Sequence, residues 1–259
     1  MGEMLVRKDR GLQQFLIWFM FTACVLGVSM LTSYQPILGN IPLNVIPALL
    51  VLIYLKPVFF EKLKLSTLVV MRTLIVLAVL NVIPGQTYVN LVLIFLIINI
   101  LEATITDFKH KQYYNFVTGL ILAGSVFLLK GIWEGGVYTA NAHTIAATIA
   151  WIVAYTLWNW IFVTGEFSPA VSLMHVGILL APIVGSIITK NPGMWLLLRA
   201  NTLTFGGILQ ISNKDYFEKS LKNNSFSKFI KFTPKKNVQI SFMAVNLLLL
   251  GYTFAAIYI

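Results

Sequence analysis

Charged residues and cysteine are both scarce in this chain. Of its 259 residues only 11% are charged and 58% are apolar, whereas soluble domains carry about 25% charged residues. The mean hydropathy is +0.82. The lone cysteine, Cys24, excludes an internal disulfide and a thiolate metal cluster. We therefore expect an integral membrane protein that crosses the cell membrane several times.

Histidines and catalytic motifs are also few. The chain has three histidines and nine acidic residues, and it lacks the H-x-x-H and H-E-x-x-H spacings of a metal site. Loops of the Walker A, G-x-G-x-x-G and G-x-S-x-G types are missing, as is an Asp-rich pair that would hold magnesium and a diphosphate. The sequence thus predicts no metal and no cofactor, and it matches no catalytic signature.

Apolar stretches fill most of the chain instead. A helix needs about 20 residues to cross the hydrocarbon core of a membrane. The candidate spans are 12–32, 41–54, 65–83, 86–107, 114–133, 143–164, 169–189, 192–211 and 238–259. Such spans leave little chain for a separate soluble domain. We expect an all-α, polytopic transmembrane helix bundle of about nine spans, with eight as the alternative, in a single integral membrane domain over 1–259.

The loops between these spans differ in their basic residues. Fifteen of the nineteen basic residues lie in alternate segments, at the N-terminus, at 55–64, at 108–113 and at 212–237. The opposite loops hold only Lys130 and Lys190, while Arg72 and Arg199 lie within spans. Because cytoplasmic loops carry the excess of Lys and Arg, we expect the N-terminus to be cytoplasmic. The loop 165–168 is the exception, since it holds no basic residue.

The segment 212–237 is expected to be a basic cytoplasmic loop. Seven lysines alternate there with aromatic residues. Such a loop can bind anionic lipid headgroups, because each lysine near the surface contributes about 1 kcal/mol. An ordinary loop with the usual cytoplasmic excess of positive charge is the simpler interpretation. Membrane lipids are accordingly the partners that we expect, and nucleic acid is not.

Four polar or charged side chains are expected at a common depth in the membrane. Counted from the span ends at 1.5 Å per residue, Arg72, Glu102, Asn159 and His175 lie about 8–10 Å below the cytoplasmic boundary. An ionisable group in hydrocarbon costs about 2.5–3.5 kcal/mol, so it usually faces a partner or a water-filled cavity. This layer is the best candidate for a functional site. Arg199 lies deeper and needs a carboxylate, a carbonyl cluster or an anionic ligand.

Helical periodicity places further polar residues beside two members of this layer. At 100° per residue, Asn99 and Glu102 share one face of the span 86–107, and Asp107 lies at the edge of that face. Tyr155 and Asn159 share a face of the span 143–164. The candidate ligand-binding residues are therefore Arg72, Asn99, Glu102, Asp107, Tyr155, Asn159, His175 and Arg199.

Structural roles are the alternative for several of these candidates. Arg72 can extend its long side chain to the interface, and Asn159 can form an interhelical hydrogen bond. Asp107 and His110 lie at the membrane edge, where a solvated position accounts for them. Glu102 has too short a side chain to reach the interface, so we expect it to be functional or paired with an arginine.

Three functions are compatible with this polar layer. The first is a small-solute carrier or permease whose site lies near the cytoplasmic side and uses Glu102 with Arg72 or Arg199. The second is an intramembrane enzyme that acts on a lipid or isoprenoid, with Glu102 or Asp107 as acid or base beside His175. The third is a non-catalytic assembly protein in which buried polar groups set the helix packing. A small molecule or a lipid is accordingly the expected ligand.

Overall fold

The computed structural model describes residues 2–55, 57, 59–221 and 227–258. About 84% of the protein is helical, which confirms the all-α expectation. The helices are α1 (Gly2–Tyr34), α2 (Pro36–Asn40), α3 (Ile46–Tyr54), α4 (Phe59–Val79), α5 (Gly85–Lys109), α6 (Tyr113–Ser125), α7 (Ile145–Glu166), α8 (Pro169–Ile188), α9 (Trp195–Ser212), α10 (Lys214–Leu221), α11 (Ser227–Phe232) and α12 (Lys236–Ala255). The shorter elements are the π-helix η1 (Ile41–Val45), the 3-10 helices η2 (Val126–Leu128) and η3 (Pro192–Met194), and the strands β1 (Lys130–Glu134) and β2 (Val137–Asn141).

Six helical segments of the described chain are long and apolar enough to cross a membrane. They are Gly11–Tyr34, Pro36–Tyr54, Gly85–Lys109, Ile145–Glu166, Pro169–Ile188 and Lys236–Ala255. The protein is therefore an integral membrane protein, as its composition predicted. Helices α4, α6 and α9 are not among the six: α6 has only 13 residues, α4 carries several charged residues, and α9 is more polar than the six. The count of nine spans stays a prediction.

The expected span 114–133 is wrong in its second half. Helix α6 ends at Ser125, and Lys130–Glu134 is strand β1, which pairs antiparallel with β2. Gly135 and Gly136 form the turn between the strands, with φ of 55° and 89°. Positive φ at both turn residues matches the twist of the paired strands, and glycine adopts it without a steric penalty. This Gly-Gly pair was the sequence signal for the hairpin.

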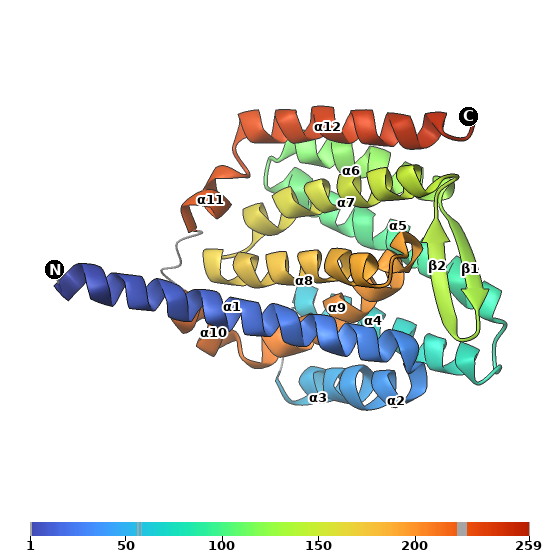
Figure 1. Ribbon diagram of the computed structural model, residues 1–259, viewed down its shortest axis with the longest axis horizontal. Coiled ribbons are helices and arrows are strands. Elements are labelled where there is room, and N and C mark those ends of the chain that lie inside the picture. The colour runs from blue at the N-terminus through green and yellow to red at the C-terminus, as the bar shows by residue number, and fades with distance from the viewer. Residues whose placement is uncertain (1, 56, 58, 222–226, 259) are drawn as a thin grey trace.

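The two ends of the helix bundle differ (Figure 1). The N-terminus, α10 and α11 lie toward one end, and the β-hairpin and the C-terminus lie at the other. Residues 110–114 form the turn after α5 and the start of α6. They line a pocket together with Pro234 and Lys236, so they belong to the first end as well. We call this first end the basic end because it holds Lys109, Lys111 and Lys236.

The basic segment 212–237 is largely helical. It holds α10 and α11, while residues 222–226 lie outside the described residues. Phe217 of α10 meets Phe21 of α1 edge-on, with 5.6 Å between ring centroids. Leu221 and Ile230 are buried in the same apolar cluster. Several apolar side chains of this segment therefore pack on the bundle.

Helices α1, α8 and α9 approach one another closely at small residues. A Cβ on Gly177 of α8 would lie 2.4 Å from the hydroxyl of Thr22 on α1. A Cβ on Gly206 of α9 would lie 2.5 Å from Ile178 of α8. Lipid tails are as apolar as side chains, so helices in a membrane associate through close van der Waals packing of this kind. These contacts fix α9, which carries Arg199, against α8.

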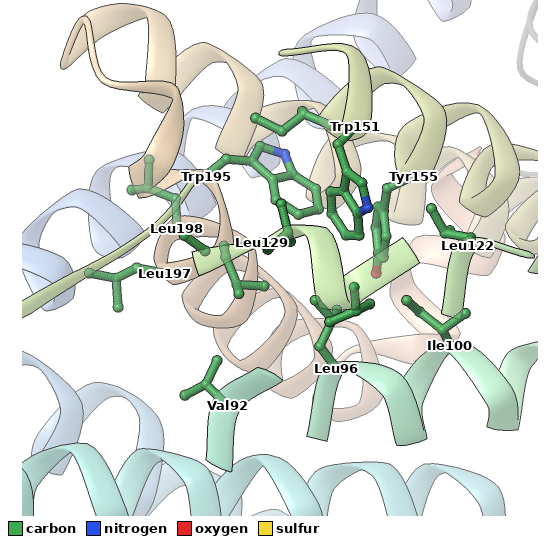
Figure 2. Packing of buried hydrophobic residues seen from close by; sticks show 14 of the residues in the cluster. Val92, Leu96, Ile100, Leu122, Leu129, Trp151, Tyr155, Trp195, Leu197 and Leu198 are labelled. Atoms are coloured by element: carbon green, nitrogen blue, oxygen red, sulfur yellow. The ribbon is translucent and has the colours of Figure 1, made fainter. Parts of the chain in front are cut away.

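An aromatic cluster of α7 and α9 lies in the main hydrophobic core (Figure 2). Tyr155 stacks on Trp151 with 5.7 Å between ring centroids, and it meets Trp195 edge-on at 4.8 Å. Such aromatic pairs contribute about 0.5–1.5 kcal/mol each beyond the burial of their area. Tyr155 is only 6% exposed. It is therefore a packed core residue in this structure.

Candidate functional site

Arg72 is buried in a cluster of neutral polar groups. Its Nη1 donates to Oδ1 of Asn201 on α9, and the residue is 1% exposed. Asn201 in turn donates through Nδ2 to Ser33 Oγ on α1, at 2.9 Å. Helix α4 begins at Phe59, so Arg72 lies about 20 Å from the start of its helix at 1.5 Å per residue. Arg72 is therefore buried between helices, and its depth in the membrane stays a prediction.

Two tyrosines lie near Arg72. Tyr88 of α5 and Tyr138 of β2 meet edge-on with 5.7 Å between ring centroids, and both are within electrostatic range of the guanidinium. Burial raises the pKa of the Tyr138 phenol, so this hydroxyl stays neutral at physiological pH. Arg72 forms no ion pair within the described part of the chain. The Arg72 cluster thus joins α1, α4, α5, α9 and the hairpin through neutral partners.

Glu102 belongs to a separate cluster with three basic side chains. Lys64 of α4 is within electrostatic range of Glu102 on α5 and of Arg199 on α9. His175 of α8 is within range of Lys64 and Arg199. Helix α4 packs against α5 and α9, and α9 packs against α8. We call Lys64, Glu102, His175 and Arg199 the inner polar site.

Two members of the inner polar site have buried polar atoms without partners. Within the described part of the chain, the Nε and Nη1 of Arg199 and the Oε1 of Glu102 make no hydrogen bond. The two nitrogens carry three of the five N–H donors of a guanidinium. Between described residues, no ion pair joins Glu102 to Arg72 or Arg199. The expected pairing of Glu102 with an arginine is therefore not formed.

A small pocket lies beside the inner polar site. Its volume is about 60 Å³. It is lined by Glu61, Lys64, Leu65, Leu68, Phe167, His175, Leu203, Gly207, Gln210 and Ile211. Arg199 shares a helical face with Leu203 and Gln210. The last two turns of α9, which lead to α10 at the basic end, thus form one wall of the pocket.

The imidazole of His175 is held against an aromatic ring. It stacks on Phe167 with 4.5 Å between ring centroids and an angle of 10° between the ring planes. Both residues line the small pocket. The stacking orients His175 beside Lys64 without requiring a backbone carbonyl as its partner. His175 therefore contributes a polar ring to the wall of the pocket.

The remaining candidates lie elsewhere. Asn99 donates to the carbonyl oxygen of Phe95 in its own helix, at 2.8 Å. Asn159 is 6% exposed and its Oδ1 has no partner. Among the eight candidates only His175 lines the pocket, while Glu102 and Arg199 lie within electrostatic range of Lys64, another lining residue. Within the expected set, the structure brings together Glu102, His175 and Arg199.

Asp107 is buried, whereas a solvated position was expected. It is 0% exposed, and its Oδ2 accepts a hydrogen bond from Asn115 Nδ2 at 2.8 Å. Asn115 also donates to the carbonyl oxygen of Trp158 at 3.3 Å. His110, by contrast, is exposed and lies 2.5 Å from Glu166, measured from Nδ1 to Oε2. Asp107 thus contributes, through Asn115, to the packing of α5, α6 and α7.

The comparisons with known proteins identify a family. The model of DUF5692, described as a family of unknown function, matches residues 8–258. The chain belongs to this family. No curated protein matches it, and no solved structure does. For this DUF5692 protein, the chemistry of the inner polar site is the evidence from which a function can be argued.

The sequence reasoning missed two residues that organise the polar clusters of the DUF5692 protein. Lys64 was counted with the loop 55–64, because the span was expected to begin at 65, whereas α4 begins at Phe59. Its spacing of eight residues from Arg72 places both on one helical face, which was a usable signal. Asn201 is a single amide in an apolar run. Nothing local distinguished it from a simple packing residue.

Proposed function

We propose that this integral membrane protein is a carrier of small anions and that the inner polar site binds them. The observation that supports this proposal is the buried guanidinium of Arg199. Three of its N–H donors have no acceptor among the described residues. An anion that enters from the pocket supplies charge-assisted acceptors for them. Lys64 and His175 both line this pocket, and each adds a side chain that can donate a hydrogen bond to the anion.

The size of the pocket favours a small solute over a lipid. A water molecule occupies about 30 Å³ of liquid, so the pocket of about 60 Å³ admits a small anion with little hydration. Sites for larger organic ligands typically have about 300–1,000 Å³. The pocket therefore supports a carrier better than an enzyme that acts on a lipid or isoprenoid. The assembly-protein alternative is weaker as well, because packing alone favours satisfied polar groups.

In this proposal Glu102 competes with the incoming anion for the positive charge of Lys64. Its carboxylate acts on Lys64, which also attracts the incoming anion. We accordingly propose that Glu102 and the anion compete for Lys64, so that the carboxylate limits how tightly the anion is held in the site.

We further propose that the basic end faces the cytoplasm and that the protein crosses the cell membrane nine times as a single domain. The excess of lysine at the basic end supports this orientation. Lys130 and Lys190 are the two basic residues of the opposite loops. An anion that enters the pocket from the basic end would then come from the cytoplasm.

Anion flux into liposomes tests the carrier proposal. The full-length protein is reconstituted, and uptake of chloride, nitrate, sulfate and phosphate is measured. Gly207 lines the pocket, and a Cβ there meets nothing within 4 Å. We therefore expect Gly207→Leu to fold and to occupy the pocket. The flux of at least one anion should fall about tenfold in this variant, which corresponds to a loss of roughly 1.4 kcal/mol.

Gly251 offers a matched control. It lies in α12, is exposed, and a Cβ there also meets nothing within 4 Å. Gly251→Leu adds the same side chain far from the inner polar site and should leave the flux unchanged. Equal flux in the two variants would contradict the proposed site. Flux no higher than in empty liposomes for all four anions would contradict the carrier.

A further inference from the structure

A second and larger pocket lies at the basic end of the bundle. Its volume is about 540 Å³. It lies between the α5–α6 turn, the end of α7 and the start of α12, and it shares no lining residue with the pocket beside the inner polar site. Its chemistry depends on five lining residues: Lys111, Gln112, Gly165, Lys236 and Gln239. We call it the basic-end pocket.

Two helix N-termini meet at the basic-end pocket. Helix α6 begins at Tyr113 and α12 begins at Lys236, and both residues line the pocket. Neither helix has a side chain that caps its first N–H groups. Free N–H groups and the positive end of the helix dipole favour a bound anion, and phosphate is a frequent one. The ammonium groups of Lys111 and Lys236 reinforce this preference.

Two buried amide oxygens require a donor. Gln112 is 6% exposed and Gln239 is 7% exposed, and no described residue donates a hydrogen bond to the Oε1 of either. Nε2 of Gln239 donates to the carbonyl oxygen of Pro234 at 2.6 Å, which fixes the orientation of this amide. A buried acceptor without a donor costs about 1–3 kcal/mol. A ligand that donates hydrogen bonds to these oxygens removes that cost.

The walls of the pocket are held in place by local contacts. Thr233, before α12, donates through Oγ1 to Thr164 Oγ1 on α7 at 2.6 Å. Lys111 has a φ of 61°, a left-handed conformation that costs about 1–3 kcal/mol for a residue other than glycine. His110 lies at the pocket and pairs with Glu166 at 2.5 Å, so this nearby carboxylate already has a partner. The pocket therefore stays basic.

We propose that the basic-end pocket binds a phosphate ester that also carries hydroxyl or amino groups. The two helix N-termini and the two lysines bind the phosphate. The oxygens of Gln112 and Gln239 accept hydrogen bonds from the hydroxyl or amino groups. This is the chemistry of a phospholipid headgroup and equally of a small soluble ester such as glycerol phosphate. The site is distinct from the proposed anion carrier site.

Binding of short-chain lipids to the full-length protein in detergent tests the proposal. The probes are dihexanoyl phosphatidylglycerol, phosphatidylethanolamine and phosphatidylcholine, with glycerol 3-phosphate as the soluble ester, and affinity is measured by isothermal titration. Phosphatidylcholine has the phosphate but no hydrogen-bond donor. We expect it to bind about tenfold more weakly than the glycerol and ethanolamine lipids, since two buried acceptors stay unsatisfied. Tight binding of glycerol 3-phosphate would assign the site to a soluble ligand, and weak binding would assign it to a lipid.

Variants of the lining lysines distinguish binding in this pocket from binding to exposed positive charge in general. Lys111→Gln with Lys236→Gln should weaken all probes about tenfold or more. The matched control is Lys109→Gln with Lys231→Gln, which removes two exposed lysines that do not line the pocket. Equal losses in the two double variants would overturn the proposal, because they would show binding to surface charge alone. Equal affinity for phosphatidylcholine and phosphatidylglycerol would overturn the assigned role of the glutamines.

Gly165 provides a variant that changes no charge. A Cβ on Gly165 would lie 2.1 Å from Nε2 of Gln112, which is the mobile end of a side chain. Gly165→Ala should therefore fold normally, displace this amide and reduce the preference for phosphatidylglycerol over phosphatidylcholine. An unchanged preference would contradict the role of Gln112. Arg199→Gln should leave all these affinities unchanged, so failure of the carrier proposal does not affect this test.

Discussion

The guanidinium of Arg72 and the amide of Asn201, 129 residues apart in the sequence, form a buried hydrogen bond between α4 and α9. Asn201 in turn donates a hydrogen bond from Nδ2 to Ser33 Oγ of α1. Hydrogen bonds thus connect α4, α9 and α1 at the buried guanidinium of Arg72. Arg199 lies two residues before Asn201 on α9, and its Nε and Nη1 have no partner among the described residues. The Nε of Arg72 likewise has none there, so Arg72 differs from Arg199 in that its Nη1 has an acceptor on a neighbouring helix.

The first prediction concerns Asn201. Asn201→Leu should lower the free energy of unfolding by about 2–3 kcal/mol, because it leaves a buried guanidinium donor without its acceptor. The double variant with Arg72→Met should recover most of this loss, since it removes both polar partners. Thermal unfolding in detergent measures both effects. Asn90→Leu, at an exposed position of α5, is the control and should be close to neutral. A double variant no more stable than Asn201→Leu would show that the two residues act independently.

The second prediction compares the two buried arginines. A buried charge without a partner is costly, and replacement of a whole buried ion pair by apolar side chains of similar volume often stabilises a protein by about 1–4 kcal/mol. Arg199→Met should therefore raise the melting temperature while it abolishes anion flux. Arg72→Met should lower the melting temperature, because Asn201 loses its donor. A large loss of stability in Arg199→Met would indicate a structural role and would remove the main support for the carrier.

The third prediction concerns Glu102. Because its carboxylate competes with the anion for Lys64, Glu102→Gln should fold normally and bind the anion more tightly, and the anion concentration that gives half-maximal flux should fall about tenfold. Glu134→Gln, at an exposed position of strand β1, should leave this concentration unchanged. Flux assays at several anion concentrations, together with thermal unfolding of each variant, make the comparison. Degradation of Glu102→Gln, with rescue when Arg72 or Arg199 is also neutralised, would instead assign Glu102 to packing.

The fourth prediction concerns orientation. Cys24 is exposed, so it is first replaced by alanine, and single cysteines are then placed at Lys62, Lys111 and Lys190. In intact cells a membrane-impermeant maleimide should label the cysteine at 190 and should not label those at 62 and 111. All three should be labelled after the cells are opened. Labelling at 111 and 190 from the same side would falsify the proposed arrangement.

The helical class and the membrane environment were accessible from the sequence because they depend on local properties. A run of about 20 apolar residues must satisfy its own backbone in lipid, and a helix does so. The spans 86–107 and 169–189 accordingly agree with α5 and α8 within a few residues. The hairpin at 130–141 was overlooked, because an apolar run that continues to Trp133 was given priority over the Gly-Gly turn that follows it.

The sequence by itself determined that this protein is a helical membrane protein with a few costly polar groups among apolar residues, and it named Glu102, His175 and Arg199 among the candidates for a site. Only the tertiary structure decided that Lys64 lies near these three and that Arg72 is hydrogen-bonded to Asn201. The reason is geometric. Helical periodicity defines the face on which a residue lies, whereas its partner depends on which helix packs against that face and at what height.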